Sequence, residues 1–277
     1  MINLIKAELY RFFKSKQFII SAVLAVTFAV IVVLLNYFLS IAITKVMGEA
    51  VIDRKTFSSL AIMINALNPG ALFGYILAVF VAVLLAMEFT DGTIRTKIIC
   101  GISKIRIYSA NYLASLIYII TIMLGYGIIS LLFGLILYSP IPQDVDALKY
   151  VGNYFMTLSF DLISYIFVSS TILLLVMLIR TQGLSSFLYI IAVIGFQFVG
   201  GILDQIIEII NAYETNMESV ITFINVINWI NPFYLMTTLS TNYYSTGLIV
   251  ANSITPLAWG ALNFYLGYLA FVKRDIK

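Results

Sequence analysis

Charged residues are nearly absent from six long intervals of this chain, and this spacing limits the possible folds more than any other feature. The intervals run from Lys16 to Lys45, Lys55 to Glu88, Arg106 to Asp144, Lys149 to Arg180, Arg180 to Asp204 and Glu218 to Lys273. A single charge, Asp161, interrupts the fourth interval. A helix needs about 20 mostly apolar residues to cross the hydrocarbon core of a bilayer. The chain is therefore expected to be an integral membrane protein.

The composition excludes several other classes of protein. Of the 277 residues, 62% are hydrophobic and 10% are charged, whereas a globular domain has about 45–50% apolar and about 25% charged residues. The chain has no histidine, and Cys100 is its single cysteine. A soluble enzyme, a disulfide scaffold, a histidine-based triad, the usual zinc sites and histidine-ligated haem are thereby excluded. The net charge of +3 is too small to indicate a nucleic-acid partner.

We expect an all-α membrane domain that covers residues 1–277 and has six transmembrane helices. Helices are favoured over barrel strands because the apolar runs are continuous, whereas the strands of a membrane barrel alternate polar and apolar residues. The expected spans are Phe18–Ser40, Ala71–Met87, Tyr112–Tyr138, Phe160–Ile179, Leu184–Leu203 and Thr255–Val272.

The basic residues predict the orientation, because lysine and arginine stay preferentially on the cytoplasmic side of short loops. With a cytoplasmic N-terminus, the inside segments hold Lys6, Arg11, Lys14, Lys16, Arg95, Lys97, Lys104, Arg106, Arg180, Lys273, Arg274 and Lys277. The outside segments hold only Lys45, Arg54, Lys55 and Lys149. A multi-pass protein of the cell membrane with both termini in the cytoplasm is therefore predicted.

Two apolar stretches are not counted as spans. Residues 204–254 carry acidic but no basic side chains, which fits an extracellular segment. Within it, Val220–Leu239 is long enough for a seventh span, but its asparagines and Pro232 are costly in hydrocarbon. Short helices at, or dipping into, the outer leaflet are expected instead. Asn65, Asn68 and Pro69 likewise indicate that Thr56–Asn68 forms a short outer segment before the second span.

The N-terminal residues 1–16 are expected to form an interfacial helix rather than a cleavable signal, because the following apolar run is too long for a signal core. Apolar residues recur at three- and four-residue intervals over Ile2–Phe13, with Lys6, Arg11 and Lys14 between them. Such a helix would lie along the inner leaflet and turn at Ser15. The alternative is a merely basic flank of the first span.

The cytoplasmic stretch between the second and third spans, residues 88–110, has the most informative pattern. A turn at Gly92 can end one helix, and Thr93 can cap the next. Ile94, Ile98, Ile99 and Ile102 then form an apolar face, with Arg95 and Lys97 elsewhere on the helix. Gly101 and Ser103 end this short helix before Arg106 leads into the third span. A short helix of this kind suits a groove on another protein.

This order of residues resembles the cytoplasmic signature of type 2 ABC transporter permeases, including exporters of bacitracin and lantibiotics. The resemblance rests on Glu88, Gly92-Thr93, Gly101, Ser103 and Arg106 after the second of six spans. The Asn231-Pro232-Phe233 turn and the amphipathic N-terminal helix also resemble features of this family. The resemblance implies that the helix from Thr93 to Ser103 is a coupling helix, framed by Glu88 and Arg106, with Arg95 and Ile98 on it. Asn111 departs from the basic residue that many relatives have near the start of the third span.

The same resemblance implies partners. The chain lacks the Gly-rich segment with a Lys-Ser or Lys-Thr pair that cradles nucleotide phosphates. A separate ATPase subunit would therefore bind ATP and Mg²⁺, and this chain would not be an enzyme. Six spans are half of the usual pathway, which implies a second permease copy or a related permease in the bilayer. Gly70 and Gly74 form a single GxxxG pattern, which we interpret as an ordinary close contact.

Asp161 is the only ionisable residue expected within a span, and it is a candidate for the cargo pathway. Because its expected place is near the outer end of the fourth span, contact with water is an alternative explanation. By family analogy alone, the cargo would be an amphipathic molecule such as an antimicrobial peptide or a lipid-like compound. The competing hypotheses are an ion-coupled secondary transporter, a membrane-embedded enzyme and a non-transporting membrane scaffold.

Overall fold

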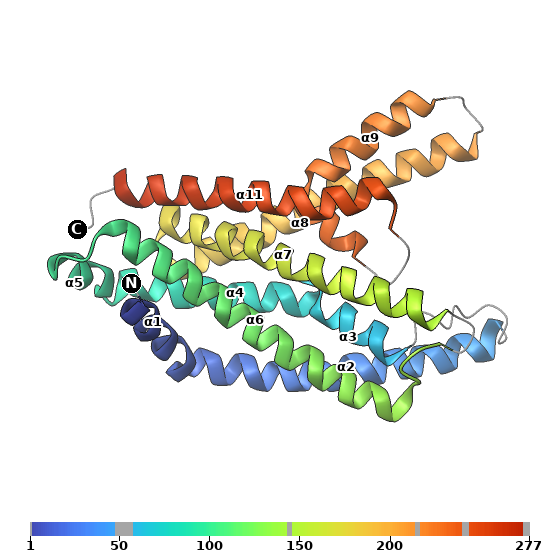
Figure 1. The fold of residues 1–277 in the computed structure, drawn as a ribbon, viewed down its shortest axis with the longest axis horizontal. Helices are drawn as coiled ribbons and strands as arrows, with labels where there is room; N and C mark the ends of the chain where they lie inside the picture. The colour runs from blue at the N-terminus through green and yellow to red at the C-terminus, as the bar shows by residue number, and fades with distance from the viewer. Residues whose placement is uncertain (1, 48–57, 143–145, 214–216, 240–243, 274–277) are drawn as a thin grey trace.

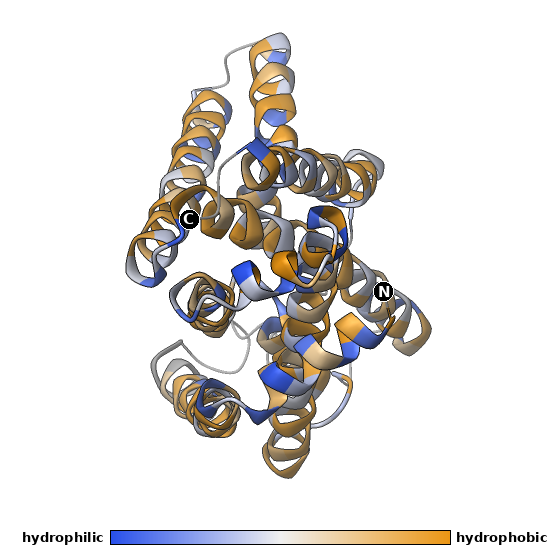
Figure 2. Cartoon of the chain, turned by 90° about the vertical axis from the view of Figure 1, so that its left-hand side faces the viewer, coloured by the Kyte–Doolittle hydropathy of each residue, from blue (hydrophilic) through white to orange (hydrophobic). Residues whose placement is uncertain are grey.

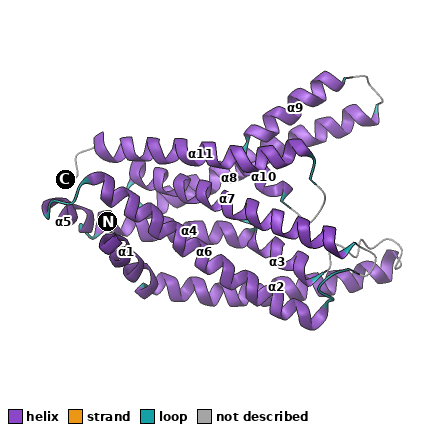
Figure 3. Ribbon diagram, in the orientation of Figure 1, coloured by secondary structure: helices purple, strands orange, loops and turns teal. Residues whose placement is uncertain are grey.

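The computed structural model describes residues 2–47, 58–142, 146–213, 217–239 and 244–273, and these residues form helices and loops without a strand (Figure 1, Figure 3). The predicted all-α class is therefore confirmed for the described residues. The helices are α1 (Ile2–Lys14), α2 (Lys16–Met47), α3 (Ser59–Leu67), α4 (Leu72–Thr90), α5 (Thr93–Ile99), α6 (Lys104–Leu137), α7 (Ala147–Ile179), α8 (Gln182–Ala212), α9 (Glu218–Ile230), α10 (Pro232–Leu235), η2 (Met236–Thr238) and α11 (Thr246–Lys273). Several charged residues that were used to predict the spans and the orientation lie outside the described residues: Arg54, Lys55, Asp144, Arg274 and Lys277.

Five helical segments are long and apolar enough to cross a membrane. They are Lys16–Ala42 in α2, Ser59–Thr90 in α3 and α4, and the helices α6, α7 and α8. A sixth is obtained if α9 and the segment Pro232–Thr238, which are bent by 89°, count as one. The helix α11 has 28 residues but is not in this apolar group, because it contains Pro256 and several polar residues. The chain is thus a helical protein embedded in a membrane.

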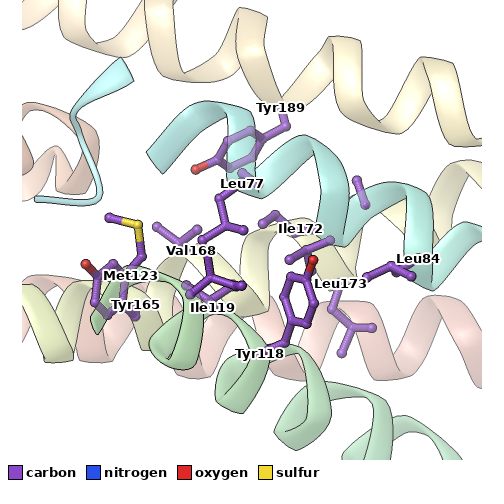
Figure 4. Close-up of a cluster of buried hydrophobic side chains, with 14 of the residues drawn as sticks. Leu77, Leu84, Tyr118, Ile119, Met123, Tyr165, Val168, Ile172, Leu173 and Tyr189 are labelled. Carbon is purple, nitrogen blue, oxygen red and sulfur yellow. The ribbon is translucent and has the colours of Figure 1, made fainter. Parts of the chain in front are cut away.

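The centre of the bundle is α7. In its most apolar window 61% of the residues are buried, compared with 22% for α2 and for α8. The helix α11 packs along α7, and α6 packs against both α2 and α3 (Figure 1). Leu77, Ile119, Val168 and Leu173 from α4, α6 and α7 meet in the apolar core (Figure 4). The least buried helices, α2 and α8, therefore have the largest faces available to lipid or to other chains.

Several helices extend beyond the spans that the charge spacing predicts. The third begins at Lys104 and the fourth at Ala147, where the Asp146 side chain accepts a hydrogen bond of 3.1 Å from the backbone N–H of Leu148. Charge-free intervals mark the part of a helix that lies in hydrocarbon, whereas caps decide where the helix itself ends. As a consequence, Asp161 lies near the middle of α7, and its predicted place near the outer end of the helix is wrong.

The segment before the second span also differs from the prediction. Residues 56 and 57 lie outside the described part of the chain, but α3 is not a surface segment: it packs against α6 and α7, and Ile64 is fully buried. A break follows at Asn68, whose side-chain amide donates to the carbonyl of Met236 at 2.8 Å and whose oxygen accepts from the N–H of Gly70 at 2.7 Å. Polar partners within the bundle thus allow an interruption that lipid would not.

The GxxxG glycines lie at this same break. A Cβ atom at Gly74 would come within 2.4 Å of the carbonyl oxygen of Pro69, and a Cβ atom at Gly70 within 2.9 Å of the Cβ of Met236. Both glycines are therefore needed for close approach within one chain. The interpretation of this pattern as an ordinary close contact is confirmed.

Two helices between α8 and α11 meet at a sharp bend. The side-chain oxygen of Asn231 accepts hydrogen bonds from the backbone N–H groups of Phe233 (3.2 Å) and Tyr234 (3.1 Å), and Pro232 occupies the first helical position of α10. This cap turns the chain by 89°. A straight seventh span over residues 220–239 is therefore absent from the described structure. The helix α8 continues past the predicted Leu203 to Ala212, and its distal part forms a projecting hairpin with α9 (Figure 1). Residues 214–216 and 240–243 of the predicted extracellular segment are outside the described residues.

The amphipathic N-terminal helix is present as α1. Phe12 is fully buried on its inner face, whereas Tyr10 is exposed. The hydroxyl of Ser15 donates to the carbonyl of Phe12 at 2.7 Å and accepts from the N–H of Phe18 at 3.2 Å. The predicted turn at Ser15 into the first span is therefore confirmed, and α1 is packed on the bundle rather than trailing from it.

Candidate functional site

One end of the bundle gathers α1, α5 and the last turn of α11 (Figure 1). Figure 2 views the molecule from this end, where hydrophilic segments lie in front of the apolar helices. The basic residues of α1, α5 and the starts of α2 and α6 are all here, whereas Lys149 begins α7 at the opposite end. Among these elements, the basic side chains are therefore concentrated at one end of the bundle.

The helix α5 is a short element between two left-handed turns. Gly92 has a φ angle of 68° and Gly101 a φ angle of 81°. A Cβ atom at either glycine would have no heavy atom within 4 Å, so the backbone conformation and not the space requires glycine. The predicted bends at both ends of this helix are confirmed.

Thr93 has a different role from the one predicted. Gly92 is the N-cap of α5, and Thr93 is the first residue of that helix. The Thr93 hydroxyl donates to the carbonyl oxygen of Glu88 at 3.2 Å. It therefore satisfies a carbonyl at the end of α4, where the backbone acceptors lack helical partners, and ties α5 back to α4.

Glu88 is the centre of a buried ion network. Its side chain has no exposed surface. One carboxylate oxygen, Oε1, pairs with the guanidinium of Arg11 and with the Lys97 ammonium, the latter at 2.6 Å, and Oε2 accepts from the Asn111 amide at 2.5 Å. Partners from α1, α5 and α6 thus converge on one residue of α4. A buried carboxylate requires such partners, because desolvation without them is very costly.

A second carboxylate, Glu8 of α1, completes the network. Lys97 pairs with Glu8 as well, and Arg11 lies 3.0 Å from it. Glu8 is 3% exposed. Burial, together with the neighbouring Glu88 carboxylate, raises the pKa of Glu8 to about 7. Sequence reasoning missed Glu8, although it shares a helical stripe with Leu4 and Phe12, and a charge on an apolar stripe is the signal that would have found it.

The two faces of α5 are not as predicted. Ile94 is 1% exposed, and Ile98 and Ile102 pack against the apolar core of the same chain. Ile99 is instead 75% exposed, with Arg95, Thr96 and Cys100 exposed beside it. Ile98 is thus partly buried against the same chain, and the most exposed isoleucine of α5 is Ile99.

Ser103 and Arg106 lie outside the network. Ser103 is the exposed N-cap of α6, and Arg106 is exposed on the first turn of that helix. Among the described residues, the ion pairs of Glu88 are with Arg11 and Lys97, and Arg106 is not one of its partners. Glu88 at the end of α4 and Arg106 at the start of α6 lie on either side of α5, but only Glu88 belongs to the buried network.

The turn between α7 and α8 also reaches this end. Arg180 has a φ angle of 63°, which is unusual for a residue with a side chain. Its guanidinium carbon lies 5.3 Å from the centre of the Phe89 ring, a distance typical of a cation–π contact. A cavity of about 450 Å³ is bounded by Arg180, Glu88 and Arg95. The turn between α7 and α8 thus contacts the end of α4 beside α5.

Asp161 lies away from this end, in the interior of the bundle. It is fully buried, so the alternative in which it reaches water is wrong. It interacts electrostatically with Tyr154 and Tyr165, two hydroxyls that contact Met63 and the carbonyl of Leu67 on α3. Among the described residues neither of its carboxylate oxygens has a hydrogen-bond partner. Asp161 is therefore a separate site from the α5 cluster, by which we mean Glu88, Glu8, Arg11, Lys97 and Asn111.

Comparison with known proteins adds no family to this description. No protein-family model matches the sequence, and no curated protein matches it. Within the described ranges, no group of three or more His, Cys, Asp or Glu side chains is placed to hold a metal ion.

Proposed function

We propose that this chain is the membrane-spanning subunit of an ATP-binding-cassette exporter, with α5 docked on a separate ATPase subunit. In this proposal α11 is the sixth span, and α9 with α10 is a re-entrant pair at the outer leaflet. The end with α1 and α5 faces the cytoplasm, so both termini do as well. The position of the basic residues and the short helix after the second span support this orientation.

The observation that carries the proposal is the buried network around Glu88. A docked subunit can move the bundle only if the contact element is rigidly connected to the spans. Glu88 and Lys97 join α5 to the end of α4, and Arg11 and Asn111 extend the connection to α1 and α6. A displacement of α5 would therefore be passed to several spans at once, because packed elements shift as units.

The docking face proposed from the structure is the exposed side of α5. It consists of Arg95, Thr96, Ile99 and Cys100. An exposed isoleucine beside a guanidinium is a typical pairing for an interface with an apolar centre and a polar rim. This face replaces the one that the sequence alone suggested around Ile98.

The proposal also includes the nucleotide, a second membrane subunit and the cargo. The partner binds ATP and Mg²⁺, and a second copy of this chain or a related permease completes the pathway through the cell membrane. The cargo is an amphipathic molecule, either an antimicrobial peptide or a lipid-like compound. The poorly buried face of α2 is the surface that such a second subunit would cover.

The test is co-purification with the ATPase encoded by a neighbouring gene. The variant Ile99→Asp places a charge at the centre of the docking face. Leu148→Asp is its matched control, since Leu148 is also highly exposed, at 83% compared with 75% for Ile99, and lies at the opposite end. We expect Ile99→Asp to lose most of the bound ATPase, and Leu148→Asp to retain it. An ATPase that remains bound to Ile99→Asp, or none that binds the unaltered chain, contradicts the proposal.

An ion-coupled secondary transporter is the second candidate, and Asp161 is the observation in its favour. Such transporters bind ions at buried charges beside interrupted helices, and Asp161 is buried near α3, which is broken at Asn68. The two candidates differ in energy source. Transport that stops when the proton gradient collapses, but continues without ATP, and that is abolished by Asp161→Asn would favour this second function.

A further inference from the structure

A cavity of about 350 Å³ lies between α7, α8, α11 and the bend that joins α9 to α10. Its volume is at the lower end of the range for ligand pockets, about 300–1,000 Å³. The walls are large apolar side chains, among them Phe167, Leu175, Phe196, Phe233 and Trp259. The cavity is separate from Asp161 and from the α5 cluster, neither of which lines it.

The polar groups in the wall are engaged with one another. The indole N–H of Trp259 donates to the carbonyl of Ile230 at 2.9 Å, and the Asn263 amide donates to the Thr171 hydroxyl at 2.8 Å. The Asn231 amide donates to the carbonyl of Phe196 at 2.7 Å. With these donors occupied, the cavity offers an occupant mainly hydrocarbon and aromatic surface.

The depth of the cavity limits what can reach it. Phe196 and Trp259 both lie near the middle of long helices, α8 and α11. At 1.5 Å per residue, each is about 20 Å from either end of its helix. An occupant that enters from the side at this depth comes from the hydrocarbon of the bilayer, and not from water or from the headgroup layer.

The surroundings of the cavity are also apolar. Phe196, Val199 and Ile230 line it and are each at least half exposed. They belong to α8 and α9, and α8 is one of the two least buried spans. These side chains therefore form an opening that faces lipid.

From these observations we infer that the cavity binds one acyl chain of a membrane phospholipid, inserted sideways between α8 and α9. The acyl chain fills a void that would otherwise leave the Asn231–Pro232 bend without packing on one side. The phospholipid headgroup stays outside the cavity, because no unengaged charged group in the wall would hold it. This inference is independent of the ATPase partner, since it concerns only the described contacts of this chain.

Trp259 offers a direct measurement, because it lines the cavity and the chain has only one other tryptophan, Trp229. In the Trp229→Phe background, Trp259 emission is recorded in phosphatidylcholine vesicles with bromine atoms near the middle of one acyl chain, and in unbrominated vesicles. Ala192→Phe then fills the cavity from α8. Ala258→Phe is the control, because Ala258 is exposed on α11 beside Trp259 but does not line the cavity.

We expect brominated chains to quench Trp259 strongly in the background chain and in Ala258→Phe. Quenching should fall at least about twofold in Ala192→Phe, because the added ring occupies the place of the acyl chain. If Ala192→Phe does not fold, Leu175→Phe fills the cavity from α7 instead. Equal quenching in the filled variant and the control would overturn the inference, because Trp259 would then only face bulk lipid.

Native mass spectrometry of the purified chain provides the second readout. A single retained phospholipid on the unaltered protein, lost in the filled variant and kept in Ala258→Phe, supports the inference. Retention of the phospholipid by the filled variant, or a peptide found in its place on the unaltered chain, overturns it.

Discussion

Glu88 and Asp161 are both fully buried carboxylates, but their surroundings are opposite. Glu88 has two cationic partners and one amide, drawn from three helices. Asp161 has no hydrogen-bond partner among the described residues. A paired buried charge holds elements together, whereas a buried carboxylate without partners is costly and is a candidate for a functional role. The α5 end is therefore held to three other helices by a paired charge network, whereas the carboxylate in the interior has no hydrogen-bond partner among the described residues.

The largest effect is expected for Glu88→Gln. The substitution removes one of the two carboxylates of the network and leaves Glu8 as the remaining described carboxylate partner of Arg11 and Lys97. Breaking a buried pair costs about 3 kcal/mol, so the variant should unfold at a clearly lower temperature in detergent. Asp91→Asn is the control, because Asp91 is exposed beside the same turn. A Glu88→Gln protein as stable as Asp91→Asn would remove the distinction between the two carboxylates.

The next effect separates the two faces of α5. Ile98→Asp puts a charge against the apolar core and should cost on the order of 2 kcal/mol, with loss of folded protein on size-exclusion chromatography. Ile99→Asp, one position further on, should leave the unfolding temperature unchanged, because Ile99 is exposed. The assignment of the inward face fails if the two variants have equal stability.

A smaller effect is expected from the titration of Glu8. Its pKa is raised from 4.5 to about 7, so the folded chain holds this proton more tightly than the unfolded chain. The corresponding stability is complete below about pH 4.5 and is lost as the pH rises through 7. The unfolding temperature should therefore fall by a few degrees over this window. In Glu8→Gln this part of the fall should disappear, and an unchanged fall would assign it to another group.

The smallest effect is expected for Asp161→Asn. An uncharged amide of the same shape replaces a carboxylate that has no described partner, so the free energy of unfolding should change by less than about 1 kcal/mol. Thermal unfolding alongside Glu88→Gln gives the comparison directly. A loss as large as that of Glu88→Gln would show that Asp161 is a structural residue.

Charge spacing and periodicity are sufficient to predict much of the architecture. The apolar intervals predict the five helical segments that are long and apolar enough to cross a membrane, whereas the predicted sixth span, Thr255–Val272, lies in α11, which is outside that group. The pattern of Ile2–Phe13 predicts α1. The burial of α3 could not be predicted, because its polar break at Asn68 is satisfied by the carbonyl of Met236, far along the chain. A single sequence does not show which distant groups will meet a local polar residue.

The candidate site shows the same limit. Glu88, Gly92 and Gly101 can be identified from local pattern, since turns and caps depend on nearby residues. The apolar face of α5 is also evident in the sequence, but a helical pattern does not tell whether the same chain or a partner covers that face. The pattern therefore does not separate Ile98 from Ile99, although only Ile99 is exposed. Glu8 has a local signal, its place on an apolar stripe, but its ion pair with Lys97 of α5 joins residues far apart in the chain and is not visible in the sequence.

The most direct test of the docking of α5 uses Cys100, the chain's single cysteine, which is exposed beside Ile99. A thiol-linked photocrosslinker attached there in inside-out membrane vesicles reports what lies against this face. The account predicts a crosslink to an ATPase subunit, and its loss in Ile99→Asp. Labelling of Cys100 by an impermeant thiol reagent from outside intact cells, or crosslinks to lipid alone, would contradict it.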